Sequence, residues 1–442
     1  MSREMKNSGV PWIGDIPNYW SAVRIKDLAD NSKNDSFTDG DWIESQYITD
    51  NGIRYYTSGN VGDGAFKPQG NGYISEETFA ALKCKYAYPG DLVIARLNAP
   101  FGRSCILPSE SDKYVLAVDI AILRTAYCKE YLNYAMQCQR YHHAVEEQAS
   151  GTAMQRISRS NLGKIKLPIP PMAEQKSIVH YLDSHCSTID SAISKHQQII
   201  EKLEEYRKAV ITQAVTKGLN PNAEMKDSGV PWIGKIPVHW EKMRIKQAGV
   251  KTGSGTTPKS ALSEYYDGNV SWIQSGDLYG VSSIEETKRS VTETALKQYS
   301  VLKVYKHPFV VIAMYGASIG NVAISNIDAC VNQACCVIMP NHSNNIAFVK
   351  YWLELCKEDF IQQSVGGGQP NISQEKILEQ VYVKPPIAEQ NDIASYLDSK
   401  CSGIANMIDQ HNQLISKLQE YKQSLIYNAV TGKIDCTTEA SI

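Results

Sequence analysis

The sequence lacks the short motifs that mark the common classes of enzyme. It holds no GxxxxGK phosphate loop, no HExxH, no GxSxG and no Cys/His cluster with the spacing of a zinc or other metal site. The glycine-rich run Gly59–Gly64 ends in Ala65-Phe66 instead of Lys-Ser or Lys-Thr, so it is interpreted as a turn. The Pro-Pro pairs of IPPMAEQ and KPPIAEQ lack the Asn/Asp-Pro-Pro-aromatic form of amino-methyltransferases. These absences predict a chain with no catalytic residues of its own.

Long apolar runs, paired cysteines and an excess of positive charge are also missing. No run of about 18 apolar residues exists, which argues against a membrane span, and the N-terminal residues lack the apolar core of a signal peptide. We therefore expect a cytoplasmic protein. The 11 cysteines include no CxxC pair, which predicts reduced and mostly buried thiols. A net charge of −2 argues against a uniformly basic nucleic-acid binder, although local basic surfaces remain compatible with it.

What the chain does contain is an internal duplication. Its 442 residues, 43% hydrophobic and 21% charged, are enough for two or more ordinary globular domains. The stretch Ala173–Lys217 recurs as Ala388–Gly432, and neither copy contains proline, so each can form one long helix. At about 1.5 Å per residue such a helix runs roughly 65 Å. Because a helix of this length needs a partner, each copy is expected to pair with the other.

Each of these stretches carries an apolar seam with alternating spacings of four and three residues, which lies on one helix face. His196 and His411 occupy the same seam position near the middle of the two helices, where a histidine is interpreted as a device for register and not as half of a catalytic pair. The seam comprises Ile178, Leu182, His185, Ile189, Ala192, His196, Ile199, Leu203, Tyr206 and Val210, and its counterpart comprises Ile393, Leu397, Lys400, Ile404, Met407, His411, Leu414, Leu418, Tyr421 and Leu425.

A second repeat precedes each half of the chain. Met5–Lys26 returns as Met225–Lys246, with 15 of 22 positions identical. Its prolines, glycines and tryptophans predict an anchored turn followed by a short strand such as Val23–Lys26. Its four tryptophans are expected to be buried anchors. They are Trp12, Trp20, Trp232 and Trp240. Repeats this far apart are too long for a solenoid, so they indicate a duplicated domain and a pseudo-symmetric molecule.

The segments between the repeated ends resemble each other only faintly. Leu92–Ala95 and Val310–Ala313 are apolar runs that open into glycine-containing turns, the pattern of a buried strand followed by a loop. Further strands are expected in 114–124 and 329–339, and helices in 130–147 and 346–365. Each segment is thus predicted to be a mixed α/β domain. A molecule that repeats its ends and helices but varies these domains is suited to reading two different targets.

The loops after the buried strands carry side chains suited to DNA. Arginine can bond guanine bidentately, and asparagine or glutamine can do the same with adenine. A second pair of loops, 151–159 and 366–374, aligns at the offset of the helices and could reach bases or phosphates. A solvated loop without function is the alternative for each residue. The DNA-binding candidates are Arg96, Asn98, Arg103, Arg156 and Arg159 in the first half, and Tyr315, Ser318, Asn321, Gln369 and Asn371 in the second.

The motifs SGVPWIGDIPNYW and SGVPWIGKIPVHW, with LPIPPMAEQKSIVHYLD and VKPPIAEQNDIASYLD, closely resemble the specificity (S) subunit of type I restriction-modification systems. The resemblance covers nearly the whole chain. It implies two target recognition domains that each read half of a split double-stranded DNA sequence. It further implies two methyltransferase (M) subunits that bring S-adenosylmethionine, and restriction (R) subunits that use ATP and Mg. No cofactor is expected in this chain.

Together these observations predict an α/β (α+β) fold, with two mixed α/β recognition domains separated by two long antiparallel helices. Antiparallel pairing predicts that His196 and His411 lie close together. Exposed flanks of the helices are candidates for the M-subunit contact, with Lys176, Glu201, Glu204 and Lys208. The alternatives are a DNA-binding adaptor or a coiled-coil scaffold outside restriction-modification. The expected boundaries are 1–165 and 221–380 for the recognition domains, and 166–220 and 381–442 for the spacer helices.

Overall fold

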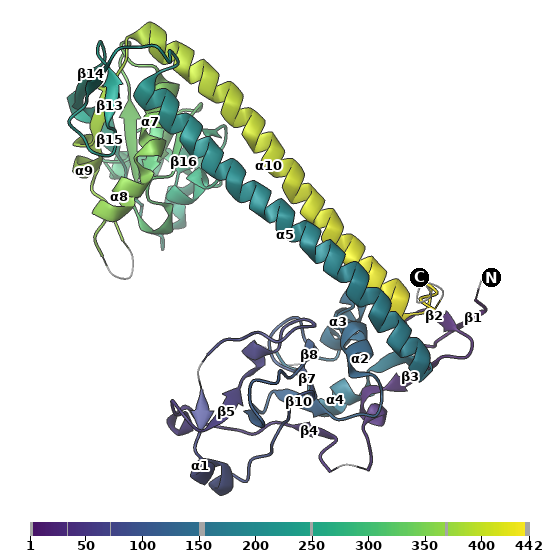
Figure 1. The fold of residues 1–442 in the computed structure, drawn as a ribbon. Helices are drawn as coiled ribbons and strands as arrows, with labels where there is room; N and C mark the ends of the chain where they lie inside the picture. The colour runs from purple at the N-terminus through teal and green to yellow at the C-terminus, as the bar shows by residue number, and fades with distance from the viewer. Residues whose placement is uncertain are drawn as a thin grey trace. The chain divides into compact units, whose positions relative to one another are not determined.

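The structure is a computed structural model, which describes residues 3–32, 34–70, 72–149, 155–247, 251–366 and 370–437. The chain divides into two compact units (Figure 1). The first comprises Met1–Gln197 and Asn412–Ile442, and the second comprises Gln198–His411. Each unit therefore combines one α/β domain with parts of both long helices. The mixed α/β class and the long helices predicted from the sequence are confirmed.

The α/β domain of the first unit is organised around strand β7 (Leu92–Ala95), whose four residues are all buried. Leu92 and Ile94 pack into the core cluster that includes the long helices, whereas Val93 and Ala95 pack into a second cluster on the opposite face. Burial on both faces explains why this strand is a continuous apolar run. The antiparallel sheet runs β4 (Phe37–Asp39), β10 (Ile120–Leu123), β7, β8 (Ser104–Ile106), and a smaller sheet runs β6 (Tyr73–Ile74), β5 (Ile53–Tyr56), β9 (Tyr114–Leu116).

The α/β domain of the second unit repeats this plan around β19 (Phe309–Ala313), which is also buried throughout. Val310 and Ile312 face the cluster that holds the long helices, and Phe309 and Val311 face another. The larger sheet runs β15 (Lys251–Ser254), β22 (Cys335–Met339), β19, β20 (Val322–Ser325), β17 (Ser283–Ile284), and the smaller runs β18 (Ser290–Val291), β16 (Tyr266–Ile273), β21 (Ala329–Val331).

The two helices predicted at 130–147 and 346–365 are each broken in two, which corrects the sequence expectation. The first breaks at 136–138, because Met136 and Cys138 are buried in the core and Cys138 takes an extended backbone. The second breaks at Cys356, which is also buried. The short helices of the domains are α1 (Glu76–Ala81), α2 (Lys129–Ala135), α3 (Gln139–Glu146), α4 (Arg159–Lys164), α6 (Glu293–Gln298), α7 (Ile346–Leu355), α8 (Lys357–Gln363) and α9 (Gln374–Leu378).

The repeated segment that opens each half forms the same pair of small antiparallel ladders. In the first unit the ladders are β1 (Met5–Asn7) with β2 (Asp15–Pro17), and β3 (Ser21–Arg24) with β11 (Lys166–Ile169). In the second they are β12 (Met225–Asp227) with β13 (Lys235–Pro237), and β14 (Glu241–Arg244) with β23 (Val381–Lys384).

Three of the four repeat tryptophans are buried as expected, but Trp232 is 43% exposed. Trp12 donates its Nε1 proton to the carbonyl of Lys166 at 3.2 Å. In the second unit the corresponding carbonyl, that of Val381, accepts instead from Trp352 at 2.8 Å. Trp352 is fully buried and makes the bond that Trp12 makes in the first unit. Trp232 therefore stays at the surface.

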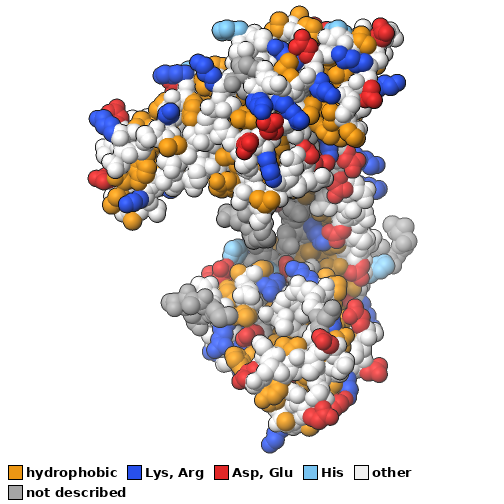
Figure 2. All heavy atoms as spheres, turned by 90° about the vertical axis from the view of Figure 1, so that its left-hand side faces the viewer, with side chains coloured by type: hydrophobic (Ala, Val, Ile, Leu, Met, Phe, Trp, Pro, Cys, Tyr) orange, Lys and Arg blue, Asp and Glu red, His pale blue; other side chains and the backbone are white. Residues whose placement is uncertain are grey.

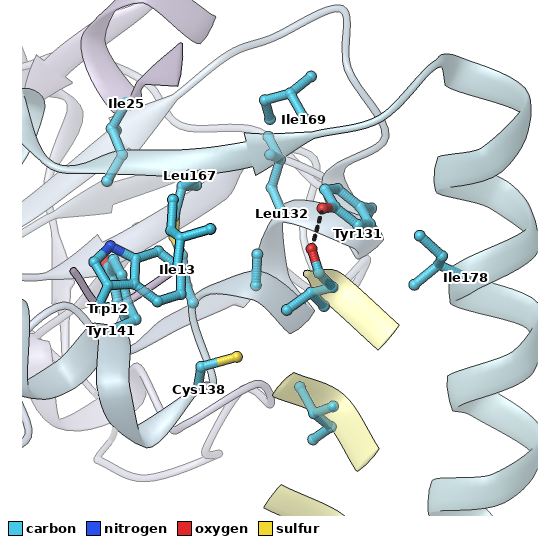
Figure 3. Packing of buried hydrophobic residues seen from close by; sticks show 14 of the residues in the cluster. Trp12, Ile13, Ile25, Tyr131, Leu132, Cys138, Tyr141, Leu167, Ile169 and Ile178 are labelled. Atoms are coloured by element: carbon cyan, nitrogen blue, oxygen red, sulfur yellow. Dashed lines mark hydrogen bonds between the residues drawn. The ribbon is translucent and has the colours of Figure 1, made fainter. Parts of the chain in front are cut away.

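The long helices are α5 (Met172–Lys217) and α10 (Ile387–Val430), and they run antiparallel within each unit. In the first unit, Arg3 contacts both Glu174 at the start of α5 and Asp435 beyond the end of α10, while Asp190 pairs with Lys422 at 2.7 Å. The order of these pairs is possible only for opposite directions. Figure 3 shows Ile178 of α5 beside the domain core, where the hydroxyl of Tyr131 donates to the carbonyl of Val430 at 3.1 Å.

The seam is buried at its ends but exposed toward its middle. Ile178 and Leu182 are buried against the first α/β domain, and Ile393 and Leu397 are buried against the second. Farther along, only the neighbouring helix is available for cover. The large seam residues that stay exposed are Ile199, Tyr206, Met407, Leu414 and Tyr421. His196 and His411 fall in different units, so their proximity stays a prediction.

All 11 cysteines are free, and ten of them are buried. Burial raises the pKa of Cys105 to about 12, which disfavours the reactive thiolate. The prediction of unpaired, mostly buried thiols is confirmed. No helix among the described residues is long and apolar enough to cross a membrane.

The uneven burial of the seam predicts unequal effects of truncation. Leu182→Ala removes a side chain with no exposure, so it should lower the free energy of unfolding by about 2–5 kcal/mol. Leu414→Ala, in the same unit but 43% exposed, should cost less than about 1 kcal/mol. Urea unfolding followed by circular dichroism measures both. Equal losses in the two variants would show that the middle of the seam is covered as fully as its ends.

Candidate nucleic-acid interface

Each central strand leads into a tight loop that returns as the next strand. β7 is followed by the loop 96–103 and then β8, and β19 is followed by the loop 314–321 and then β20. The loops close in the same way, because the amide of Gly102 donates to Ala95 at 2.9 Å and that of Gly320 donates to Ala313 at 3.0 Å. Both glycines have positive φ, near 80°, a conformation that other residues rarely adopt.

The second predicted loop of each half lies directly against the first. Leu97 pairs with Arg156 in an isolated antiparallel bridge, and Tyr315 pairs with Asn371 in the same manner. Beside these bridges, the amide of Ile157 donates to Arg96 at 3.0 Å and that of Ile372 donates to Met314 at 2.9 Å. The structure thus brings together, in both units, the two loops that the sequence singled out separately.

A third loop contacts these two loops in each unit. In the first unit, Arg103 donates from Nε to the carbonyl of Val61 at 3.1 Å and from Nη1 to that of Asn98 at 2.8 Å. In the second unit, the turn η6 (Ser275–Leu278) contacts the turn η7 (Gly316–Ser318) inside the loop after β19. We call these three adjoining loops the loop platform of each unit: 57–62, 96–103 and 155–158 in the first, and 274–279, 314–321 and 370–373 in the second.

Arg96 does not present its guanidinium to solvent, which corrects its interpretation as an exposed base reader. The residue is only 6% exposed, and it donates to the carbonyls of Ile157 at 3.0 Å and Val118 at 2.5 Å. Its Nε also lies 3.2 Å from Asp39 Oδ1. The equivalent position of the second unit is the buried Met314. Arg96 therefore holds the platform together from inside.

Arg103 has a similar supporting role, because it is half-buried and its donors are directed to backbone carbonyls. Burial lowers its pKa from the ordinary value of an arginine. The candidates that reach solvent in the first unit are Asn98, Arg156 and Arg159. Asn98 has a φ of 62°, which points to a tight turn at the tip of its loop.

The two arginines of the second loop differ in how far they are constrained. Arg156 has a side chain 62% exposed, and its nearest acidic partner, Asp119, is 4.0 Å away. Arg159 begins α4 and is 43% exposed, with Nε 3.2 Å from Asp39 Oδ2 and Nη1 donating to the carbonyl of Phe37. Asp39 therefore contacts Arg96 with one oxygen and Arg159 with the other. Arg156 is the candidate best placed to contact DNA.

In the second unit the exposed candidates are Tyr315 and Asn371, which face each other across the loop bridge. Ser318 donates to the carbonyl of Tyr315 at 2.8 Å, which stabilises the turn, and Asn321 accepts a hydrogen bond from Lys357 at 2.7 Å. Gln369 lies outside the described residues. The platform of this unit thus presents an aromatic ring and an amide where the first presents an arginine.

Comparison with known proteins identifies the family. The profile of the type I restriction modification DNA specificity domain matches residues 17–205 and again 237–419. The chain belongs to this family. It is a specificity subunit, and the prediction that it is the DNA-recognition component and not a catalytic one is confirmed. The adaptor and scaffold alternatives are not favoured.

Individual relatives cover much of the chain. The chain is similar to the MjaVIII type I restriction enzyme specificity subunit of Methanocaldococcus jannaschii, with 26% identity over 66% of this chain and 67% of the relative. It is also similar to the EcoBI specificity subunit of Escherichia coli, with 24% identity over 79% and 74%. A solved structure described as the basis of complex assembly and conformational transition of the type I R-M system shares the fold, with a TM-score of 0.72, 15% identity, and coverage of 95% and 99%.

The sequence did not single out several residues at the loop platforms of this specificity subunit. Lys357 lies beside the loop after β19 through its bond to Asn321, and Tyr279, which follows η6, is 81% exposed. Outside the loop platform of the first unit, Trp42 is also an exposed aromatic residue, at 69%. No local pattern marks an aromatic side chain as exposed, since the same residue types form the cores. The bond of Lys357 depends on packing between α8 and a distant loop.

The charges on the remaining surface are consistent with DNA binding at local sites and not over a uniformly basic surface. Lys and Arg side chains are interspersed with Asp and Glu on the face that Figure 2 shows. Among the described residues there is no group of three or more His, Cys, Asp or Glu able to hold a metal ion. The four candidates for partner contact, Lys176, Glu201, Glu204 and Lys208, are all exposed on α5, and Lys208 forms an ion pair with Glu358 of α8.

The different surroundings of two arginines make a direct prediction. Arg96→Ala should lower the free energy of unfolding by about 3 kcal/mol, because it leaves two buried carbonyls without their donor and one oxygen of Asp39 without its cationic partner. Arg156→Ala should change it by no more than about 0.5 kcal/mol, because that side chain is exposed. Denaturant unfolding of both variants measures the difference. A stable Arg96→Ala protein would mean that the arginine is not part of the support.

Proposed function

We propose that this specificity subunit reads a split DNA target, with the loop platform of each unit contacting one half. The observation that supports this is the repetition of one backbone arrangement with different side chains. The bridge that joins the loops is Leu97 to Arg156 in the first unit and Tyr315 to Asn371 in the second. A repeated support with different contacts is what two unlike half-sites require.

The chemistry of the exposed candidates fits such reading. An arginine such as Arg156 can form two hydrogen bonds to the O6 and N7 atoms of guanine, and an asparagine such as Asn371 can do so to adenine. Other contacts from Lys357 and Arg159 would go to phosphates, which add affinity without sequence information. Two units joined by continuous helices gain from effective concentration once one of them is bound. The half-sites are then expected about one DNA turn, roughly 34 Å, apart.

The long helices are proposed to set the spacing between the half-sites and to bind two methyltransferase subunits. Those partners would supply S-adenosylmethionine and methylate adenine, and restriction subunits would add ATP- and Mg-dependent translocation and cleavage. Helix α5 has a surface that neither α/β domain covers. This surface includes the exposed middle of the seam and the charged residues Lys176, Glu201 and Glu204. No step of this chemistry requires a catalytic group from the specificity subunit.

The proposed division of the target predicts separable effects in cells. Methylome sequencing should find a split motif that disappears when the gene is deleted. Complementation with Arg156→Ala should relax or abolish recognition of one half only, and Asn371→Ala should do so for the other half. A lost bidentate contact costs about 1–3 kcal/mol of discrimination, or about 5–150-fold between cognate and altered sites.

Arg24→Ala is the matched control, because Arg24, the last residue of β3, is exposed, pairs with Asp27 and lies outside the loop platforms. Its methylome should equal that of the intact protein. The split-target proposal would be wrong if the motif were continuous, or if both platform variants relaxed the same bases.

The proposed partner surface on α5 is tested by charge reversal. The triple variant Lys176→Glu, Glu201→Lys, Glu204→Lys should reduce co-purification with the methyltransferase subunit by at least tenfold. The reason is that each reversed side chain would then repel the partner group that it attracts in the intact protein. A control variant, Glu77→Lys with Lys297→Glu on the exposed faces of α1 and α6, should co-purify normally. Unchanged recovery of the triple variant would remove these residues from the contact.

A further inference from the structure

The second unit contains a pocket of mixed polar and apolar lining between the end of α5 and the start of α10. Its volume is about 320 Å³, at the lower end of the range of small-ligand sites, roughly 300–1,000 Å³. Two carboxylates, those of Glu389 and Asp392, face it. The polar lining also includes Lys217, Asn220 and His239, and Ala223 lines it with a methyl group.

The same place in the first unit is filled by Arg3. Its guanidinium lies 2.5 Å from Glu174 through Nη1 and 2.6 Å from Asp435 through Nη2. Burial acts to lower the pKa of Arg3, but the hydrogen bond to Asp435 and the charge of Glu174 outweigh it and raise this pKa above its ordinary value. The guanidinium therefore stays charged. The first unit thus shows what this part of the fold holds when it is occupied: one guanidinium between the start of one long helix and the residues after the other.

The positions of the two units correspond bond by bond. Trp20 donates to Glu174 at 3.0 Å, as Trp240 does to Glu389 at 2.9 Å. Asn18 donates to the carbonyl of Glu4, as Val238 does to that of Glu224, so Ala223 stands where the first unit has Arg3.

The acidic residue beyond the helix has a counterpart as well. Asp435 accepts from the amide of Thr437, and Asn220 accepts from that of Asn222, both at 3.0 Å. The second unit therefore repeats the first-turn carboxylate, has the neutral amide of Asn220 where the first unit has Asp435, and lacks the arginine. The exposure of the first-turn carboxylate differs as the absence of an arginine in the second unit requires. The side chain of Glu174 is 8% exposed, whereas that of Glu389 is 39% exposed.

We infer that this pocket is a binding site for a guanidinium group supplied from outside the chain. Glu389 would accept its paired N–H donors, and Asp392 adds a carboxylate where the first unit has Ser177. His239 contacts one oxygen of Glu389 at 2.6 Å, in the position where Tyr19 contacts Glu174. The ammonium of Lys217 is directed to the carbonyls of Ile233 and Lys235. The group can come from a soluble guanidinium compound or from an arginine of a partner protein.

The test introduces an arginine of the chain itself into the pocket. Ala223→Arg should place a guanidinium against Glu389 as Arg3 does against Glu174, and Asn222→Arg is the control that adds the same charge one residue away. N-acetyl-arginine amide and its neutral isostere N-acetyl-citrulline amide are titrated into the full-length chain by calorimetry. The arginine compound should bind the intact protein and the Asn222→Arg control saturably. Binding to Ala223→Arg should be at least tenfold weaker, and the citrulline compound should not bind.

A second arm separates the two sources. Each variant is mixed with the methyltransferase partner, and the amount of complex is measured by size-exclusion chromatography. Weaker assembly of Ala223→Arg than of Asn222→Arg assigns the site to a partner arginine. Equal assembly together with lost binding of the arginine compound assigns it to a soluble ligand. If the two variants behave alike in both arms, the inference is overturned. The calorimetric arm uses neither DNA nor a partner, so its failure leaves the proposed function untouched.

Discussion

The hydrogen bond from a buried tryptophan to a carboxylate in the first turn of each long helix is the constraint on which the rest of the structure depends. Trp20 and Trp240 belong to the segments that open each half, and Glu174 and Glu389 begin the helices about 150 residues later. The positive end of the helix dipole favours a carboxylate at this point, and the indole holds it in place. This bond ties the start of each repeat to its helix, whatever sequence lies between them.

The interposed domains could therefore diverge without loss of the frame. Trp352 replaces Trp12 as the donor to one carbonyl, and Met314 stands where the first unit has the charged Arg96. In each case a backbone position is kept while the side chain that supports it changes. The differences between the units then accumulate in the exposed residues of the loop platforms, where they alter the proposed binding surface and leave the core intact.

Features that depend on local pattern were predictable from the sequence, and features that depend on partners far along the chain were not. Proline-free seams predicted α5 and α10, and the apolar runs before glycine turns predicted β7 and β19. The breaks at Cys138 and Cys356 were missed because each is caused by burial of a turn against a core that no local pattern describes. The burial of Arg96 was missed for the same reason, since its acceptors Val118 and Ile157 lie 22 and 61 residues away. Loop positions could be named in advance, but which side chains face outward could not.

The bridges between neighbouring loops bear on the thermodynamics of recognition. A free loop loses conformational entropy when a ligand orders it, and that loss subtracts from the affinity. Here the loop after β7 is closed at its base, bridged at Leu97 and held by the donors of Arg96 and Arg103. Its backbone is ordered when the chain folds, before any DNA is present. In the proposed mode of recognition, association has to immobilise side chains alone, so a few contacts per unit can discriminate between bases with little entropic penalty.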